Sequence, residues 1–275
     1  MPLAENRLSE AVSVFTYGGE TLAESYGSNA TVFFGKGAIV LVDPFVSPVQ
    51  AAELDALLRA RDASPVTHVV LTHHHTDHAL GASYFAAKGA EVIAHPEAAA
   101  RMADEHPALI AGRRKDPDLA PLFAEAEPCA PSRLVTASLA FEAGGLPFDV
   151  FHPGHAHTPG DLCLYAPSLG VLVSGDLVSS GYHPNLEDAN VAGWRAALQS
   201  LRRIPFRTLV PGHGPPGGRE AVEDQIRYLD RAGEIVARAR KTIGEDEATS
   251  ALALAFPAFR LRIVLPTLVD RFRRM

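Results

Sequence analysis

Cysteine and long apolar runs are scarce in this sequence, and each shortage excludes a class of protein. The 275 residues include 2 cysteines and 1 tryptophan. Two cysteines cannot build the disulfide framework of a small secreted domain. No run approaches the ~18 consecutive apolar residues of a membrane-spanning helix, so we expect no membrane partner. Residues 1–10 lack the basic-then-apolar order of a signal peptide, which predicts a cytoplasmic protein.

Basic charge is also in deficit. The sequence has 25 Lys and Arg against 32 Asp and Glu, a formal net charge of −7. Nucleic-acid binding usually requires a basic face, so we expect no nucleic-acid partner. The content of 47% hydrophobic and 21% charged residues is typical of a globular chain with a large core. The length predicts one large domain, or a core with an appendage.

Strand-like and helix-like segments alternate along the chain, which favours an α/β fold. The predicted strands are 31–34 and 38–42 (a hairpin), 67–71, 91–95, several short strands within 134–173, and 208–210. The predicted helices are 48–61, which begins after the capping residue Ser47, then 79–88, 190–204, 219–241 and interrupted helices within 245–275. We expect helices and loops over residues 96–132, which would form either a lid or a solvated insertion. For residues 251–265 we expect core packing, a dimer contact or a cap over an acyl pocket.

Residues 71–78 (LTHHHTDH) contain the densest group of metal-ligand residue types in the chain. Four candidate ligands, His73, His75, Asp77 and His78, lie within six residues. Imidazole and carboxylate groups at this density suit a divalent ion such as zinc. The group follows a buried strand and precedes a helix, and open α/β sheets place their ligand sites at such turns.

Three later strand ends bring further ligand-type residues. They are His155 or His157 in a Gly/Pro-rich turn, Asp176 after an apolar strand, and His213 in a Pro-Gly-His-Gly segment. Strands of one sheet that end in such residues predict side chains that converge on one edge of the sheet.

In this combination the sequence resembles the metallo-β-lactamase superfamily. The His-x-His-x-Asp-His signature stands at 73–78, the later ligands match His157, Asp176 and His213, and the aspartate that supports the metal loop matches Asp43. The resemblance covers about residues 11–217. It implies a four-layer αβ/βα sandwich with metals at one edge of the sheets. We therefore expect a catalytic domain over 1–217 and a C-terminal helical extension over 218–275.

The resemblance also implies a ligand set for two zinc ions, with iron or manganese as alternatives. The first ion takes His73, His75 and His157, the second takes Asp77, His78 and His213, and Asp176 bridges both. His157 is preferred to His155 because Thr-Pro-Gly follows it, as in the family. His74 is predicted to point away from the ions, and a pocket role for His183 is left open.

These ligands imply a metal-dependent hydrolase for a small-molecule substrate. A hydroxide shared by the two ions would attack the substrate, with Asp77 and Asp176 in the catalytic centre and the Tyr182 hydroxyl as an electrophilic aid. An aspartate at the bridging position is typical of the family's thioesterases, lactonases and phosphodiesterases, whereas classical lactamases carry Cys or Ser there. We therefore expect thioester or lactone hydrolysis. The alternatives are a mononuclear iron persulfide dioxygenase, a β-lactamase-type amide hydrolase and a non-catalytic binding protein; a homodimer is left open.

Overall fold

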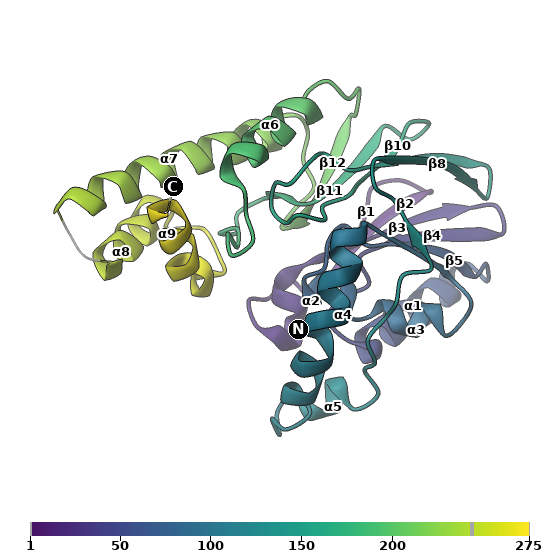
Figure 1. Cartoon of the computed structure of the whole chain (residues 1–275). Coiled ribbons are helices and arrows are strands. Elements are labelled where there is room, and N and C mark those ends of the chain that lie inside the picture. The colour runs from purple at the N-terminus through teal and green to yellow at the C-terminus, as the bar shows by residue number, and fades with distance from the viewer. Residues whose placement is uncertain (1, 243–244, 275) are drawn as a thin grey trace.

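Two β-sheets pack face to face in the computed structural model of this chain, which describes residues 2–242 and 245–274 (Figure 1). The larger sheet follows chain order: β1 (Ala4–Arg7), β2 (Val12–Thr16), β3 (Asn29–Gly35), β4 (Ala38–Val42), β5 (Val66–Val70), β6 (Glu91–Ala94) and β7 (Arg133–Leu134). The smaller sheet has the order β12 (Thr208–His213), β11 (Val171–Ser179), β10 (Cys163–Ala166), β9 (Leu146–Phe151) and β8 (Ser138–Ala143). The predicted hairpin is confirmed, because β3 and β4 pair antiparallel.

Helices cover the outer faces of both sheets. The first part of the chain provides η1 (Leu22–Gly27), α1 (Pro48–Arg61), α2 (Thr76–Ala79), α3 (Ala82–Ala86), α4 (Pro96–Arg113) and α5 (Ala120–Phe123). The second part provides α6 (Val191–Leu201), α7 (Glu220–Thr242), α8 (Glu245–Ala255), η2 (Arg262–Val264) and α9 (Leu265–Arg273). Figure 1 shows α7, α8 and α9 together at one end of the molecule, away from α1, α3 and α5.

Alternation along the strands creates the layers. On β4, Ile39 and Leu41 pack in the cluster that includes α1, whereas Val40 and Val42 lie in the cluster between the two sheets. This period of two is what a strand buried on both faces requires. On the outer face of the smaller sheet, Leu172 packs in one cluster with α6, α7, α8 and α9. The predicted four-layer sandwich with C-terminal helices is therefore confirmed.

One predicted helix is wrong in detail. Residues 79–88 contain the last residue of α2 and the whole of α3, and Leu80 and Gly81 separate the two short helices. A Cβ atom on Gly81 would lie 1.9 Å from the carbonyl oxygen of Pro44. The loop after β4 therefore packs directly on the backbone here, and this tertiary contact takes precedence over a continuous helical period.

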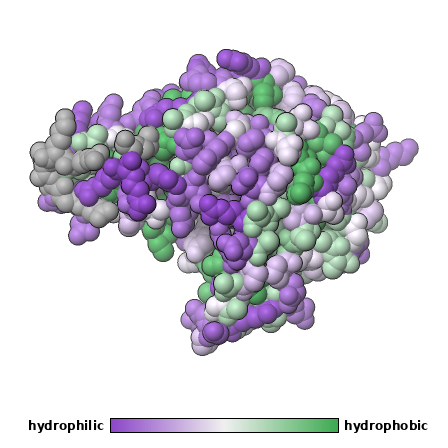
Figure 2. Space-filling view, viewed as in Figure 1, coloured by the Kyte–Doolittle hydropathy of each residue, from purple (hydrophilic) through white to green (hydrophobic). Residues whose placement is uncertain are grey.

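The surface on one side of the molecule is largely hydrophilic. In Figure 2 hydrophobic residues occur there only as separate patches, consistent with apolar side chains buried between the layers. No helix within 2–242 or 245–274 is both long and apolar enough to cross a bilayer. Met1 and Met275, which bound the segments predicted as 1–217 and 218–275, lie outside the described residues, and the division between those segments stays a prediction.

Candidate metal centre

Asp43, at the end of β4, holds the loop that follows β5. Its Oδ1 accepts a hydrogen bond from the Thr72 backbone N–H (2.8 Å), and its Oδ2 accepts one from the Thr72 hydroxyl (2.6 Å). The same Oδ2 lies 2.9 Å from Nδ1 of His78. Asp43 has a left-handed backbone conformation (φ 58°), which is uncommon for residues other than glycine. Residues with such a conformation occur most often at functional sites. The supporting position predicted for Asp43 is thus confirmed.

His73, His75 and His157 form the first group of candidate ligands. One ring nitrogen from each lies within 4.8 Å of those of the other two, and His157 Nε2 is 3.1 Å from His75 Nδ1. His73 and His157 are buried. Burial lowers the pKa of His73 well below its usual value and lowers the pKa of His157 to about 3. Both imidazoles are therefore neutral at pH 7, which is the form that binds a metal.

Asp77, His78 and His213 form the second group. Their ligand atoms also lie within 4.8 Å of one another, and His78 Nε2 is 3.3 Å from His213 Nε2. Asp77 Oδ2 lies 3.4 Å from each of these two nitrogens. Although burial opposes it, the carboxylates of Asp77 and Asp176 raise the pKa of His78 well above its ordinary value.

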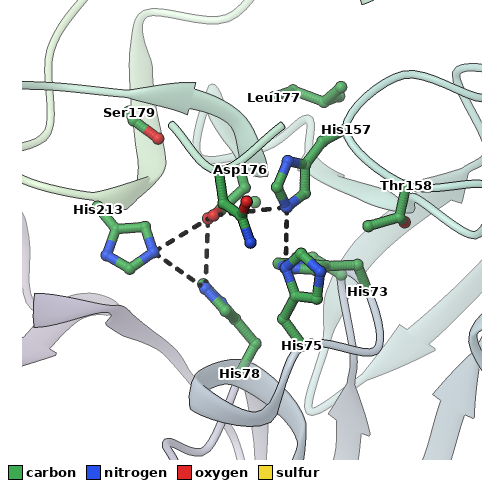
Figure 3. A network of polar contacts seen from close by, with 12 residues as sticks. His73, His75, His78, His157, Thr158, Asp176, Leu177, Ser179 and His213 are labelled. Carbon is green, nitrogen blue, oxygen red and sulfur yellow. Dashed lines mark hydrogen bonds and ion pairs between the residues drawn. The ribbon is translucent and has the colours of Figure 1, made fainter. Parts of the chain in front are cut away.

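Asp176, on β11, lies between the two groups (Figure 3). Its Oδ1 is 3.3 Å from His78 Nε2, and its Oδ2 is 3.3 Å from His213 Nε2 and 3.7 Å from His157 Nε2. Its carboxylate is buried, and a Cβ atom on Gly212 would lie only 1.8 Å from Oδ1. Glycine at 212 therefore allows β12 to pass close to this carboxylate.

The donor set fits two divalent ions. Within each group, two imidazole nitrogens face each other at hydrogen-bond distance, although each ring has its other nitrogen available for a proton. Nε2 of His73 is buried without any hydrogen-bond partner, which is costly unless a ligand satisfies it. Five imidazoles and two carboxylates are ligands that zinc accepts readily. The structure thus brings together all seven predicted ligands; that they bind metal stays a prediction.

Outer polar contacts orient three of the five imidazoles, those of His75, His78 and His213. His78 presents Nδ1 to Asp43, and His213 presents Nδ1 to the backbone carbonyl of Tyr26 at 3.1 Å. His75 presents Nε2 to Asp188 Oδ2 at 3.3 Å. In the metal-bound form each of these partners would accept a hydrogen bond from the outer nitrogen and leave the inner nitrogen unprotonated for the metal, the usual arrangement around metal-bound histidine.

A cavity of about 460 Å³ opens onto the two groups. His75, Asp77, Asp176 and His213 contribute to its floor. Side chains of α4 form one wall, and residues 261–264 contribute apolar side chains to another. The predicted insertion 96–132 and part of the predicted segment 251–265 therefore border the site.

Two neighbouring histidines lie outside the ligand groups. His155 is exposed, and its Nε2 lies 2.8 Å from the backbone carbonyl of Asp188, so the structure favours His157 as the ligand. His74 is buried and directs Nε2 toward Asp188 (3.4 Å) and Glu105 (3.9 Å). One ligand atom from each of His74, His75 and Asp188 also lies within 4.8 Å of the other two, so that His74 points away from the ions stays a prediction.

Tyr182 and His183 take places that the sequence did not specify. The Tyr182 hydroxyl donates to the Gly19 carbonyl (3.4 Å) and accepts from Arg260 Nη1 (3.1 Å), while its ring lies against His213. An electrophilic role for Tyr182 would require its hydroxyl to leave these partners. His183 is buried beside the cavity, and its Nδ1 lies 2.6 Å from the Tyr228 hydroxyl.

Sequence reasoning missed Asp188, Tyr26 and Arg113, which border the same cavity. None of them belongs to a spaced ligand motif, and each reaches the site from a separate segment. Of these three residues, only Asp188 could have been found from the sequence, because it is an acidic residue between Asp176 and the helix predicted at 190–204.

Comparison with known proteins gives consistent results. The family described as "Metallo-beta-lactamase superfamily" matches residues 25–213. The metallo-beta-lactamase type 2 of Bacillus cereus is 28% identical over 219 residues, which cover 78% of this chain and 77% of that protein. Metallo-beta-lactamase IND-1 of Chryseobacterium indologenes is 23% identical over 235 residues, covering 84% of this chain and 88% of that protein.

Solved structures share the same architecture. The structure of a metallo-beta-lactamase from Pontibacter korlensis superimposes with a TM-score of 0.69 at 24% identity. The match covers 83% of this chain and 99% of that one. At this identity the likeness describes the fold alone.

Proposed function

From the premise that this chain belongs to the metallo-β-lactamase superfamily and is a metal-dependent hydrolase, we propose that it uses two zinc ions to hydrolyse a small ester-like substrate, a thioester or a lactone. The observation that carries the proposal is the position of Asp176 between the two ligand groups, within 3.7 Å of nitrogens from both. A carboxylate there suits a site that holds two ions.

In the proposed site, His73, His75 and His157 would hold one ion, Asp77, His78 and His213 would hold the other, and Asp176 would be shared between them. A pair of divalent ions supplies Lewis-acid activation and lowers the pKa of water from 15.7 towards ~7. Asp43, Asp188 and the Tyr26 carbonyl keep the imidazoles in the tautomers that the site needs. Asp77 and Asp176 supply the negative charge that balances the ions.

The cavity supports a substrate with an apolar part. Leu261, Ile263 and Val264 line it opposite α4, and Leu109 of α4 adds to this surface. An acyl chain or a lactone ring would bury apolar area there, at a gain of about 25 cal/mol per Å². The two catalytic carboxylates would then lie at the polar end of the same cavity.

A β-lactamase-type amide hydrolase is the second candidate, because relatives with that name match more than three quarters of the chain. Asp176 weighs against it as the main activity, since the resemblance associates the lactamases with Cys or Ser at this position. The sequence also left a mononuclear iron persulfide dioxygenase as an alternative. No feature of the described residues favours this alternative.

Metal quantitation coupled to a hydrolysis screen tests the proposal. We expect two zinc ions per chain and turnover of thioester or lactone probes in preference to β-lactams. His75→Ala and Asp176→Ala should abolish turnover while the far-UV spectrum remains that of the wild type. Asp118→Asn, an exposed change that also removes one negative charge, is the matched control. Full activity of the chelator-treated, metal-free enzyme would refute the proposal.

A further inference from the structure

One face of α4 forms a wall of the cavity. Arg101, Glu105, Leu109 and Arg113 all line it, and they recur every fourth residue. Residues at this spacing lie on one side of a helix. The wall therefore runs along the helix, with Arg101 at one end and Arg113 at the other.

The two arginines of this wall differ in their partners. Arg101 pairs with Glu105 (Nη1 to Oε1, 2.8 Å) and with Asp188 (Nη2 to Oδ1, 3.3 Å). Arg113 has no carboxylate within ion-pair distance among the residues that the structure describes. Its Nη2 donates to the Thr76 hydroxyl at 3.0 Å, and its guanidinium lies 5.0 Å from the centre of the Phe123 ring.

The remaining nitrogen of Arg113 is unsatisfied. Nη1 is buried and has no hydrogen-bond partner. A buried N–H group without a partner is costly even on a half-buried guanidinium, whereas a charge-assisted hydrogen bond to a carboxylate or phosphate is among the stronger polar contacts. Thr76 lies between His75 and Asp77 in the sequence, so its contact with Arg113 places the guanidinium beside the two groups of candidate ligands.

Tyr26 provides a second free donor at this end of the cavity. Its backbone is left-handed (φ 49°), as is that of Ser25, and its carbonyl accepts from His213. Its side chain lines the cavity, and its hydroxyl has no hydrogen-bond partner among the described residues. Uncommon backbone at a cavity is typical of residues kept for binding.

We propose that Tyr26 and Arg113 form an anion subsite that binds a carboxylate or phosphate end group of the substrate. The inference rests on the proposed function and narrows it: the substrate is an ester-like compound with a second, anionic group. That group binds on the side of Asp77, while the apolar part lies against residues 261–264. Arg101 cannot take this role, because its charge is already paired twice.

Binding of matched small anions tests the subsite without any need for turnover. The probes are glutarate, its monomethyl ester and 4-phosphonobutyrate, titrated calorimetrically into the zinc-loaded enzyme. All three have one carboxylate that can reach a metal, and only the ester lacks a second anionic group. We expect the wild type to bind glutarate or the phosphonate about 10- to 100-fold more tightly than the ester, as a charge-assisted contact allows. The stronger of the two identifies the end group.

Variants separate binding from a purely structural role of Arg113. We call the ratio of the Kd of the ester to the Kd of glutarate or the phosphonate the preference. In Arg113→Met the preference should fall to near 1, and Arg113→Lys should retain part of the preference. Tyr26→Phe should reduce it by about 2- to 10-fold, the range of a neutral hydrogen bond. Lys115→Met is the matched control, since it removes an exposed positive charge two residues away and should leave the preference unchanged. Zinc content and thermal midpoint, measured in parallel, report whether each variant is folded.

A kinetic arm uses the S-phenyl thioester of glutaric acid and the same thioester with its free carboxyl methylated. We expect Arg113→Met to raise KM for the charged thioester alone. A wild-type preference near 1 in the binding assay, or a preference that survives in Arg113→Met, overturns the inference. If no thioester or lactone is hydrolysed, the proposed function fails, and the binding ratios still decide the subsite.

Discussion

At the scale of single residues, His75 shows how much of the site depends on contacts outside the ligand groups. One of its ring nitrogens faces His157, and the other lies 3.3 Å from the carboxylate of Asp188. The side-chain hydrogen bonds from His74 and His75 hold the pKa of Asp188 far below its usual value. Asp188 is therefore an anion that orients His75 and increases the basicity of its other nitrogen.

We predict that Asp188→Asn weakens metal binding and leaves the fold intact. Loss of such an outer carboxylate typically costs 10- to 100-fold in metal affinity, and we expect roughly tenfold here because asparagine still accepts a hydrogen bond. Competition with a chromophoric zinc chelator measures the change. Asp118→Asn is the control for charge. Equal zinc affinity in Asp188→Asn and the wild type would show that Asp188 does not orient His75.

At the scale of secondary-structure elements, α1 follows directly from its local sequence. Ser47 accepts a hydrogen bond from the Gln50 backbone N–H (3.2 Å), and Pro48 occupies the first helical position. Ser47 is also fully buried, so water cannot replace this bond. The capping signal thus specifies the helix that packs in one cluster with β4, the strand that Asp43 directly follows.

We predict that Ser47→Ala lowers the free energy of unfolding by about 1 kcal/mol, because the first turn of α1 loses its side-chain acceptor. Ser47→Thr retains a hydroxyl and should lose less. Urea denaturation followed by circular dichroism measures both variants. An unchanged midpoint for Ser47→Ala would mean that the cap contributes nothing to stability.

The elements also show where sequence-based prediction ends. The hairpin of β3 and β4 and the extent of α1 could be predicted, because turn residues and caps are local signals. The seven candidate ligands that cluster in the structure were predicted from the resemblance to the superfamily, whereas the residues alone left His155 and His157 as alternatives. The break at Gly81 could not be predicted, because it arises from contact with Pro44, which is far away in sequence. Arg113 and Tyr26 were missed for the same reason. What distinguishes Arg113 is that its Nη1 is buried without a hydrogen-bond partner, and what distinguishes Tyr26 is its place in the cavity wall beside it; no local pattern encodes either.

At the scale of the whole molecule, the centre lies where the two sheets meet. His73, His75, Asp77 and His78 follow strand β5 of the larger sheet, while Asp176 and His213 lie on strands of the smaller one. The apolar cluster between the sheets fixes the position of one sheet relative to the other, and therefore the position of the ligands that each sheet contributes. The C-terminal helices share a core with α6 and β11, so they contribute to the same frame. Ions bound at this junction would connect the two halves of the sandwich.

Metal removal should therefore lower the stability of the whole chain. Ligand binding to the native state stabilises it by about 2.7 kcal/mol at a free concentration 100 times the Kd. For a chain of this size that corresponds to a rise of roughly 5–10 °C in Tm. We expect dialysis against a chelator to lower Tm by this amount, and stoichiometric zinc to restore it, in a single cooperative transition measured by calorimetry. In His157→Ala and Asp176→Ala the zinc-dependent rise should shrink, because each variant removes a predicted metal ligand. Identical Tm values with and without bound zinc would show that the ions do not connect the two halves.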